Sequence, residues 1–152
     1  MKIIKILALC LALVCFAACG ADKAEIPEPA ALYGEIKAAV ELAPMSDVAE
    51  YMLEADTGIT ADEYSAAVYY ILDEGTAPDQ IIIVKANDTA AADAVEQKLK
   101  GWLTYQEEGA QVYMTENMPL FQNGIIRRNG QTVSLIVSSK AEEIAKVYDR
   151  YK

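Results

Sequence analysis

Hydrophobic and polar residues alternate with a period that changes along the chain, and each change predicts a new element. Over residues 30–42 apolar side chains recur at helical spacing, and Pro29 stands before them, where the missing N–H of a proline costs nothing. A second, shorter helix is predicted over residues 46–54, with Ser46 as its N-cap and Gly58 as its stop. The start of the domain is therefore expected to be helical.

A buried strand and a long helix are predicted in the middle of the chain. Residues 80–86 form a β-branched run that is too apolar to face water on either side. Asp88 or Thr89 then opens an amphipathic helix that extends to about Gln106. A further short helix is predicted over residues 116–121.

The clearest local pattern is a β-hairpin near the C-terminal end. Two strands, over residues 125–128 and 131–137, flank Asn129 and Gly130. An Asn-Gly pair accommodates the positive φ that a type I′ turn needs at both central positions. A final amphipathic helix follows the second strand. This part of the chain therefore predicts two antiparallel strands and a helix that packs on them.

One segment, residues 66–72, fits two structures. The Thr60-x-x-Glu63 spacing is typical of a capping box and favours a helix, whereas the Val-Tyr-Tyr-Ile run at residues 68–71 favours a strand. Periodicity alone leaves both open. If the segment is a strand, the element order is α-α-β-β-α-β-β-α. That order predicts a single α+β domain, a mainly antiparallel sheet of about four strands with amphipathic helices packed on one face.

The N-terminal segment is typical of an export signal. Lys2 and Lys5 precede an apolar run over residues 6–16, and two alanines then lead to Cys19. This pattern predicts a lipoprotein signal peptide, in which the Cys19 thiol is lipidated and becomes the new N-terminus. An ordinary signal peptidase cut is the alternative, with Cys19 as one more apolar cysteine of the signal.

The lipoprotein interpretation divides the chain into a signal peptide over residues 1–18, a lipidated tether over 19–28 and a single domain over 29–152. A diacylglyceryl group supplies two chains, which suffice for stable anchoring to the outer face of the cytoplasmic membrane. Cys10 and Cys15 leave with the signal, so no disulfide is expected in the exported domain.

Composition excludes several classes of function. The chain has 23 acidic and 13 basic residues, a net charge of −10, so it repels phosphate backbones and nucleic acid is not expected as a partner. It has no histidine, which removes the commonest general base and the commonest transition-metal ligand. Neither a catalytic serine motif nor a glycine-rich phosphate loop is present. We therefore expect no metal and no cofactor.

A few side chains are candidates for a binding surface. Lys85 interrupts the apolar strand and would hold a charge at a pocket mouth, or simply extend its ammonium to water. Tyr69 and Tyr70, with Tyr105 and Tyr113, would line a ligand or protein surface, or form core edges with a hydrated hydroxyl. These alternatives stay open at the level of sequence.

Three stretches form a pattern known from one family, namely Gly-Ile-Thr-x-Asp-Glu at residues 58–63, residues 68–71 and residues 79–88. Through them, over about residues 32–151, the chain resembles domain of unknown function 4358, a family of small lipoproteins found mostly in clostridia and their relatives. Gln80 stands where members commonly have an acidic residue. The resemblance implies a Gram-positive surface lipoprotein without an assigned activity, and it favours a strand at residues 66–72.

Two functions are therefore expected as alternatives. The first is a non-enzymatic, membrane-anchored module that binds an envelope protein or a small ligand. The second is an envelope enzyme, or an accessory to one, that works through carboxylates. An exposed apolar or tyrosine-rich surface would favour the first, and converging carboxyl groups with raised pKa values in a cleft would favour the second.

Overall fold

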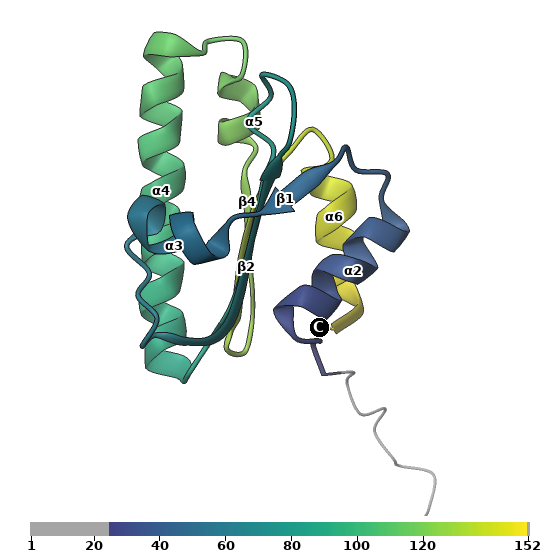
Figure 1. Cartoon of the computed structure of the whole chain (residues 1–152), viewed down its shortest axis with the longest axis vertical. Coiled ribbons are helices and arrows are strands. Elements are labelled where there is room, and N and C mark those ends of the chain that lie inside the picture. The colour runs from purple at the N-terminus through teal and green to yellow at the C-terminus, as the bar shows by residue number, and fades with distance from the viewer. Residues whose placement is uncertain (1–24, 152) are drawn as a thin grey trace, which may run out of the picture.

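The computed structural model describes residues 25–151, which form one α+β domain, as predicted. Its centre is a five-stranded antiparallel sheet with the spatial order β1-β2-β3-β5-β4 (Figure 1). The strands are β1 (Met45–Asp47), β2 (Tyr64–Leu72), β3 (Gln80–Ala86), β4 (Ile125–Asn129) and β5 (Thr132–Val137). The predicted number of about four omitted the short edge strand β1.

Helices cover both faces of this sheet, and this corrects the expectation that they pack on one face. On one side lie α3 (Ala49–Thr57), α4 (Thr89–Tyr113) and α5 (Met118–Gln122), and on the other lie α2 (Pro29–Ala39) and α6 (Ala141–Tyr148), which a 3₁₀ turn, η2 (Asp149–Tyr151), follows (Figure 1). The described residues accordingly contain two hydrophobic clusters separated by the sheet.

The central strands explain why two layers of helices are needed. Along β3, Ile82 and Val84 pack in the cluster with α4, whereas Ile81 and Ile83 pack in the cluster with α2 and α6. Successive side chains of a strand point to opposite faces. Because β3 is apolar at every one of these positions, either face left open to water would expose isoleucine or valine.

The β1–α3 segment also differs from the sequence prediction. Ser46 lies in β1 rather than at a helix N-cap, and α3 begins at Ala49. The Asp47 carboxylate accepts hydrogen bonds from the backbone N–H groups of Ala49 and Tyr69, both at 3.0 Å. Asp47 therefore ties the start of α3 to β2. The predicted stop is confirmed, since Gly58 ends α3 in the left-handed conformation, at a φ of 71°.

The ambiguous segment is a strand. β2 runs from Tyr64 to Leu72 and pairs with both β1 and β3. The capping-box contact nevertheless forms, because the Glu63 carboxylate accepts from the Thr60 backbone N–H at 2.7 Å. No helix follows it. The contact closes a turn before β2, so a local motif that is common at helix starts serves here in a loop.

The hairpin is confirmed, but its turn lies one residue further along than predicted. Asn129 pairs with Thr132, which leaves Gly130 and Gln131 as the two loop residues. Gly130 has a φ of 58°, and no residue other than glycine has a positive φ in the described part of the chain. Positive φ at the first central position alone matches a type II′ turn rather than a type I′ turn.

This turn makes Gly130 sensitive to substitution. We expect Gly130→Val to reduce the free energy of unfolding by about 1–3 kcal/mol, because a β-branched residue is strained at positive φ. Gln131→Ala, in the same loop at negative φ, is expected to change it by no more than about 0.5 kcal/mol. Thermal unfolding of both variants measures the difference. Equal effects would show that the turn does not constrain the hairpin.

Candidate functional site

The site is built around the C-terminal part of α4, which is longer than the sequence predicted. The helix begins as expected, with the Asp88 carboxylate accepting from the Ala91 N–H at 2.8 Å. It continues past Gln106 to Tyr113. Ala110 is fully buried in the same cluster as Phe121 of α5, so the last turns are held by packing against α5.

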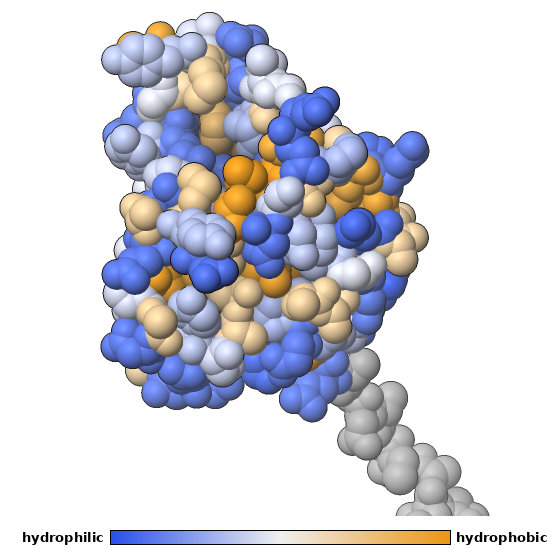
Figure 2. Space-filling model, viewed as in Figure 1, coloured by the Kyte–Doolittle hydropathy of each residue, from blue (hydrophilic) through white to orange (hydrophobic). Residues whose placement is uncertain are grey.

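A groove of about 520 Å³ lies at this end of α4. Its lining residues come from the β2–β3 loop, α4 and α5, and they are Pro78, Tyr105, Gln106, Glu108, Gly109, Tyr113, Met114 and Phe121. We call this site the tyrosine groove. Tyr105 is 68% exposed and Tyr113 is 84% exposed. Figure 2 shows hydrophobic residues reaching the surface in the hollow beside this half of α4.

The loop that forms one wall of the groove is fixed to the opposite wall. The Asn117 side-chain amide, between α4 and α5, donates to the Thr76 carbonyl at 2.9 Å. Pro78 follows in the same loop and lines the groove. Two segments that are far apart in sequence therefore meet here, and the groove is a product of the tertiary fold.

A buried polar network holds α4 against the sheet beside the tyrosine groove. Gln80 is only 3% exposed, and its side-chain oxygen accepts from the Trp102 ring N–H and from the Tyr69 hydroxyl, both at 3.2 Å. The Gln80 amide donates to the Gln106 side-chain oxygen at 2.7 Å. Because Gln106 lines the groove and Gln80 opens β3, this chain of bonds positions the groove wall relative to the core.

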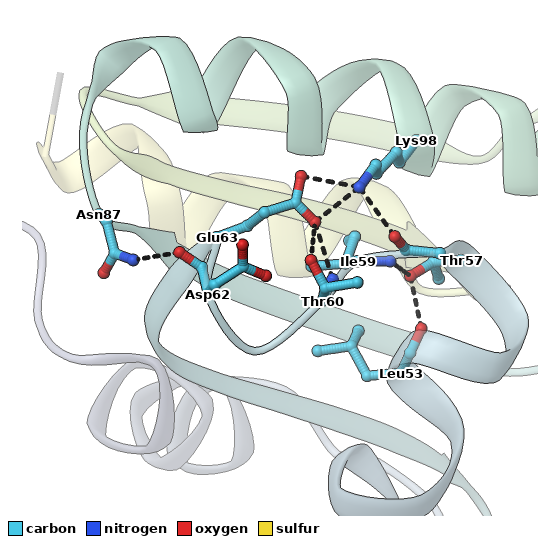
Figure 3. A network of polar contacts seen from close by, with 9 residues as sticks. Leu53, Thr57, Ile59, Thr60, Asp62, Glu63, Asn87 and Lys98 are labelled. Atoms are coloured by element: carbon cyan, nitrogen blue, oxygen red, sulfur yellow. Dashed lines mark hydrogen bonds and ion pairs between the residues drawn. The ribbon is translucent and has the colours of Figure 1, made fainter.

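A second network fixes the loop between α3 and β2 to α4 (Figure 3). The Lys98 ammonium, from α4, donates to both oxygens of the Glu63 carboxylate, at 2.6 and 2.7 Å, and to the Gly58 carbonyl at 2.8 Å. Burial raises the pKa of the Glu63 carboxyl, but the hydrogen bonds from Lys98 and Thr60 outweigh it, so this pKa lies below its usual value. Glu63 is therefore a carboxylate at neutral pH, and its contacts are structural.

Removing the Lys98 ammonium should destabilise the domain in a pH-dependent way. We expect Lys98→Met to reduce the free energy of unfolding by about 1–3 kcal/mol at pH 7, because Glu63 then lacks a charged donor. The pKa of Glu63 is lower in the folded state than its unfolded value of about 4.3. The stabilisation is thus complete above that value and is lost as pH falls through the folded pKa.

A second lysine of the same helix provides the matched control. Lys100 forms an exposed i,i+4 pair with Glu96, so Lys100→Met should cost only about 0.3–0.5 kcal/mol. Chemical denaturation of both variants between pH 3 and 7 measures the effect. A Lys98→Met difference that does not shrink at acid pH would contradict the assignment to Glu63.

The sequence of this domain matches a known protein family. A family model described as "Domain of unknown function (DUF4358)" matches residues 38–138. The chain belongs to this family. The expected resemblance is confirmed over that stretch, which contains the whole sheet and all segments that line the tyrosine groove. No curated protein and no solved structure matches the chain.

The DUF4358 fold gives the Gly-Ile-Thr-x-Asp-Glu stretch a structural explanation. Gly58 ends α3, Ile59 is buried in the core, and Thr60 is bonded to Glu63. The Asn87 side-chain amide donates to the Asp62 carbonyl at 2.8 Å and joins this loop to the end of β3 (Figure 3). The residues that carry the resemblance thus link three elements of the fold.

The structure places the predicted site residues of this DUF4358 domain in separate positions. Lys85 forms an ion pair with Glu28, and the resulting hydrogen bond raises the pKa of its ammonium group. Tyr69 is 2% exposed, so it presents no surface, and burial beside Asp56 raises the pKa of its hydroxyl. Cys19 lies outside the described residues.

The other three predicted tyrosines also lie in different places, one against α2 and two in the tyrosine groove. Tyr70 stacks on Tyr33 of α2, with ring centroids 3.4 Å apart and planes within 7°. Only Tyr105 and Tyr113 come together in the groove. Sequence reasoning missed Met114 because the helix was expected to end at Gln106, and it missed Pro78 because a tertiary contact, between Asn117 and Thr76, brings that loop to the groove. The apolar residues between positions 110 and 114 were the available signal that the helix continues.

No helix within residues 25–151 has both the length and the hydrophobicity of a membrane span. The same residues contain no group of three or more histidine, cysteine, aspartate or glutamate side chains arranged to hold a metal ion.

Proposed function

We propose that this DUF4358 domain is a non-catalytic binding module, held at the outer face of the cytoplasmic membrane by a lipid on Cys19, whose partner docks in the tyrosine groove. The observation that carries this proposal is the exposure of Tyr105 and Tyr113, about two turns apart along α4, in an apolar groove of ligand-accommodating size. Aromatic side chains with this much exposed surface are enriched at interfaces, because they supply contact area at a low entropic cost.

The carboxyl groups favour binding over catalysis. A carboxylic acid that acts as a general acid needs a raised pKa. The resolved shifts go the other way: the pKa of Asp62 is lowered by its hydrogen bond with Thr60, and that of Glu96 by its hydrogen bonds with Lys100 and Arg128. Glu63 follows the same direction. Hydrogen bonds and ion pairs hold these three carboxylates in the ionised form, which supports the binding module over the envelope enzyme.

The geometry of the domain suits a tethered receptor. The first described residues and the start of α2 lie at one end of the molecule, and the C-terminal end of α4 lies at the opposite end (Figure 1). With 25 residues, α4 is about 38 Å long at 1.5 Å per residue. A lipid on Cys19 would therefore hold the start of the domain near the membrane and present the tyrosine groove away from it.

Site-specific photocrosslinking in intact cells tests the binding site. A photoreactive amino acid is placed at position 113, in the groove, or at position 143, an exposed position of α6 on the other face of the sheet. We expect a discrete adduct from position 113 that position 143 does not give, and that Tyr105→Ala weakens. Adducts of equal yield from both positions, or none from position 113, would overturn the proposal.

Metabolic labelling tests the anchor separately. A palmitate analogue should label the wild-type chain and leave Cys19→Ala unlabelled, because only the thiol accepts the lipid. Cys15→Ala is the matched control and should be labelled like the wild type. Equal labelling of Cys19→Ala would refute the anchor without affecting the assignment of the groove.

A further inference from the structure

The segments that form the tyrosine groove carry many carboxylates and no cation. The segments that form it run through the β2–β3 loop, the second half of α4 and α5, and their acidic residues are Asp73, Glu74, Asp79, Glu107, Glu108 and Glu116. No lysine or arginine occurs anywhere in residues 38–84 or 101–126. The groove therefore has a strongly negative surrounding surface.

None of these six carboxylates has an ion-pair partner within the described residues. The ion pairs of the described residues all lie away from these six, and they are Glu28–Lys85, Glu35–Arg150, Glu63–Lys98, Glu96–Lys100, Glu96–Arg128 and Asp93–Arg128. The charge near the groove is thus left uncompensated by the domain itself. A cationic partner would supply the missing countercharge.

The helix α4 adds to this negative potential. Its 25 residues end at Tyr113, and its last turn contains no basic residue. Unsatisfied carbonyl groups at a helix C-terminus carry a partial negative charge, equivalent to about half an elementary charge, which a nearby lysine or arginine usually offsets. Here that end of the helix lies at the groove, so backbone and side chains attract the same kind of ligand.

We infer that the occupant of the tyrosine groove is a cationic, partly apolar segment of a partner polypeptide. An apolar side chain of that segment fills the groove beside Tyr105 and Met114, and lysine or arginine side chains next to it reach the surrounding carboxylates. A cation over an exposed tyrosine ring gains a further attraction. This inference rests on the proposed function, because it names the chemistry that the same groove recognises.

The distribution of the charges favours a polypeptide over a small cation. Glu108 is the one carboxylate among the residues that line the groove, and the other five lie outside the lining, in the β2–β3 loop, in α4 and in the α4–α5 connection. A small ammonium ligand inside the groove would be close to Glu108 alone. An extended segment would cross the groove and place successive cations against Glu108 and against the carboxylates of the β2–β3 loop.

A peptide-binding experiment on the full-length chain in a non-ionic detergent tests this inference. The probes are a twelve-residue peptide of lysine, leucine and alanine, the same peptide with glutamate in place of lysine, and a peptide of lysine and alanine alone. Trp102, the single tryptophan of the chain, lies 5.6 Å from Tyr105 between ring centroids, and its fluorescence reports on the groove. We expect the lysine–leucine–alanine peptide to bind most tightly and the glutamate peptide not to bind.

Two double variants with the same change in charge locate the contact. Glu107→Gln with Glu108→Gln removes the one carboxylate that lines the groove and its neighbour in α4, and Glu142→Gln with Glu143→Gln removes two exposed carboxylates from α6. We expect the first to weaken binding of the lysine–leucine–alanine peptide by about three- to tenfold at low salt, and the second by less than about twofold. Raising the salt concentration should reduce this difference.

Three other outcomes would contradict the inference, and each would point to a different explanation. Equal weakening in both double variants would mean that only the net charge of the domain attracts the peptide. Binding of the glutamate peptide with similar affinity would mean that the groove selects apolar surface without regard to charge. No binding of any peptide, together with a specific crosslink from position 113 in cells, would reject the cationic occupant and leave the proposed function in place.

Discussion

Ile82→Ala and Ile83→Ala are each expected to reduce the free energy of unfolding by about 2–5 kcal/mol. Both side chains are completely buried, and they lie on opposite faces of β3, in different hydrophobic clusters. Truncating a buried isoleucine removes its transfer free energy and leaves a cavity. A sheet with helices on one face would tolerate one of the two substitutions, so the pair of measurements tests the two-layer packing directly.

Chemical denaturation monitored by circular dichroism measures both values. Ser65→Ala, at an exposed position of β2, is the control and should change stability by no more than about 0.5 kcal/mol. A cost below about 1 kcal/mol at either Ile82 or Ile83 would show that one face of the sheet is not tightly packed.

Phe121→Ala is expected to cost about 3–5 kcal/mol and to disrupt the tyrosine groove as well. Phe121 is 2% exposed, belongs to the cluster on the α4 face, and also lines the groove from α5. Loss of a buried aromatic side chain creates a large cavity. Because α5 has only five residues, it depends on tertiary packing for its helical conformation.

The neighbouring groove residue separates stability from binding. Tyr113→Ala removes a side chain that is mostly exposed, so the free energy of unfolding should change by about 0.5 kcal/mol or less, while the crosslink or peptide binding at the groove is lost. Thermal unfolding and peptide titration on the same two variants give the comparison. A large loss of stability in Tyr113→Ala would mean that this tyrosine is part of the core.

The sequence pattern correctly predicted those elements whose formation depends mostly on residues close together in the chain. The hairpin, the strand at residues 80–86 and the N-cap of the long helix follow from turn chemistry, β-branched content and capping, and all three are confirmed. The turn itself was misplaced by one residue, because strand pairing sets the register. In the structure Asn129 pairs with Thr132, which moves the loop to Gly130 and Gln131.

Elements that depend on distant partners were predicted less well. β1 has three residues and exists because it pairs with β2, and Ser46 was accordingly mistaken for a helix cap. The C-terminal turns of α4 depend on contacts with α5. The apolar run at residues 80–86 implies that both faces of β3 are buried, which is inconsistent with the prediction of helices on one face of the sheet only.

The sequence by itself determined the α+β class, most of the element boundaries and the negative charge of the chain, because these follow from periodicity, capping and composition. Only the tertiary structure decided which tyrosines are accessible. The Tyr69 hydroxyl donates to Gln80 and the Tyr70 ring stacks on Tyr33. Tyr105 and Tyr113, by contrast, are exposed. Side-chain exposure depends on which elements pack together, and that packing joins residues from distant parts of the chain.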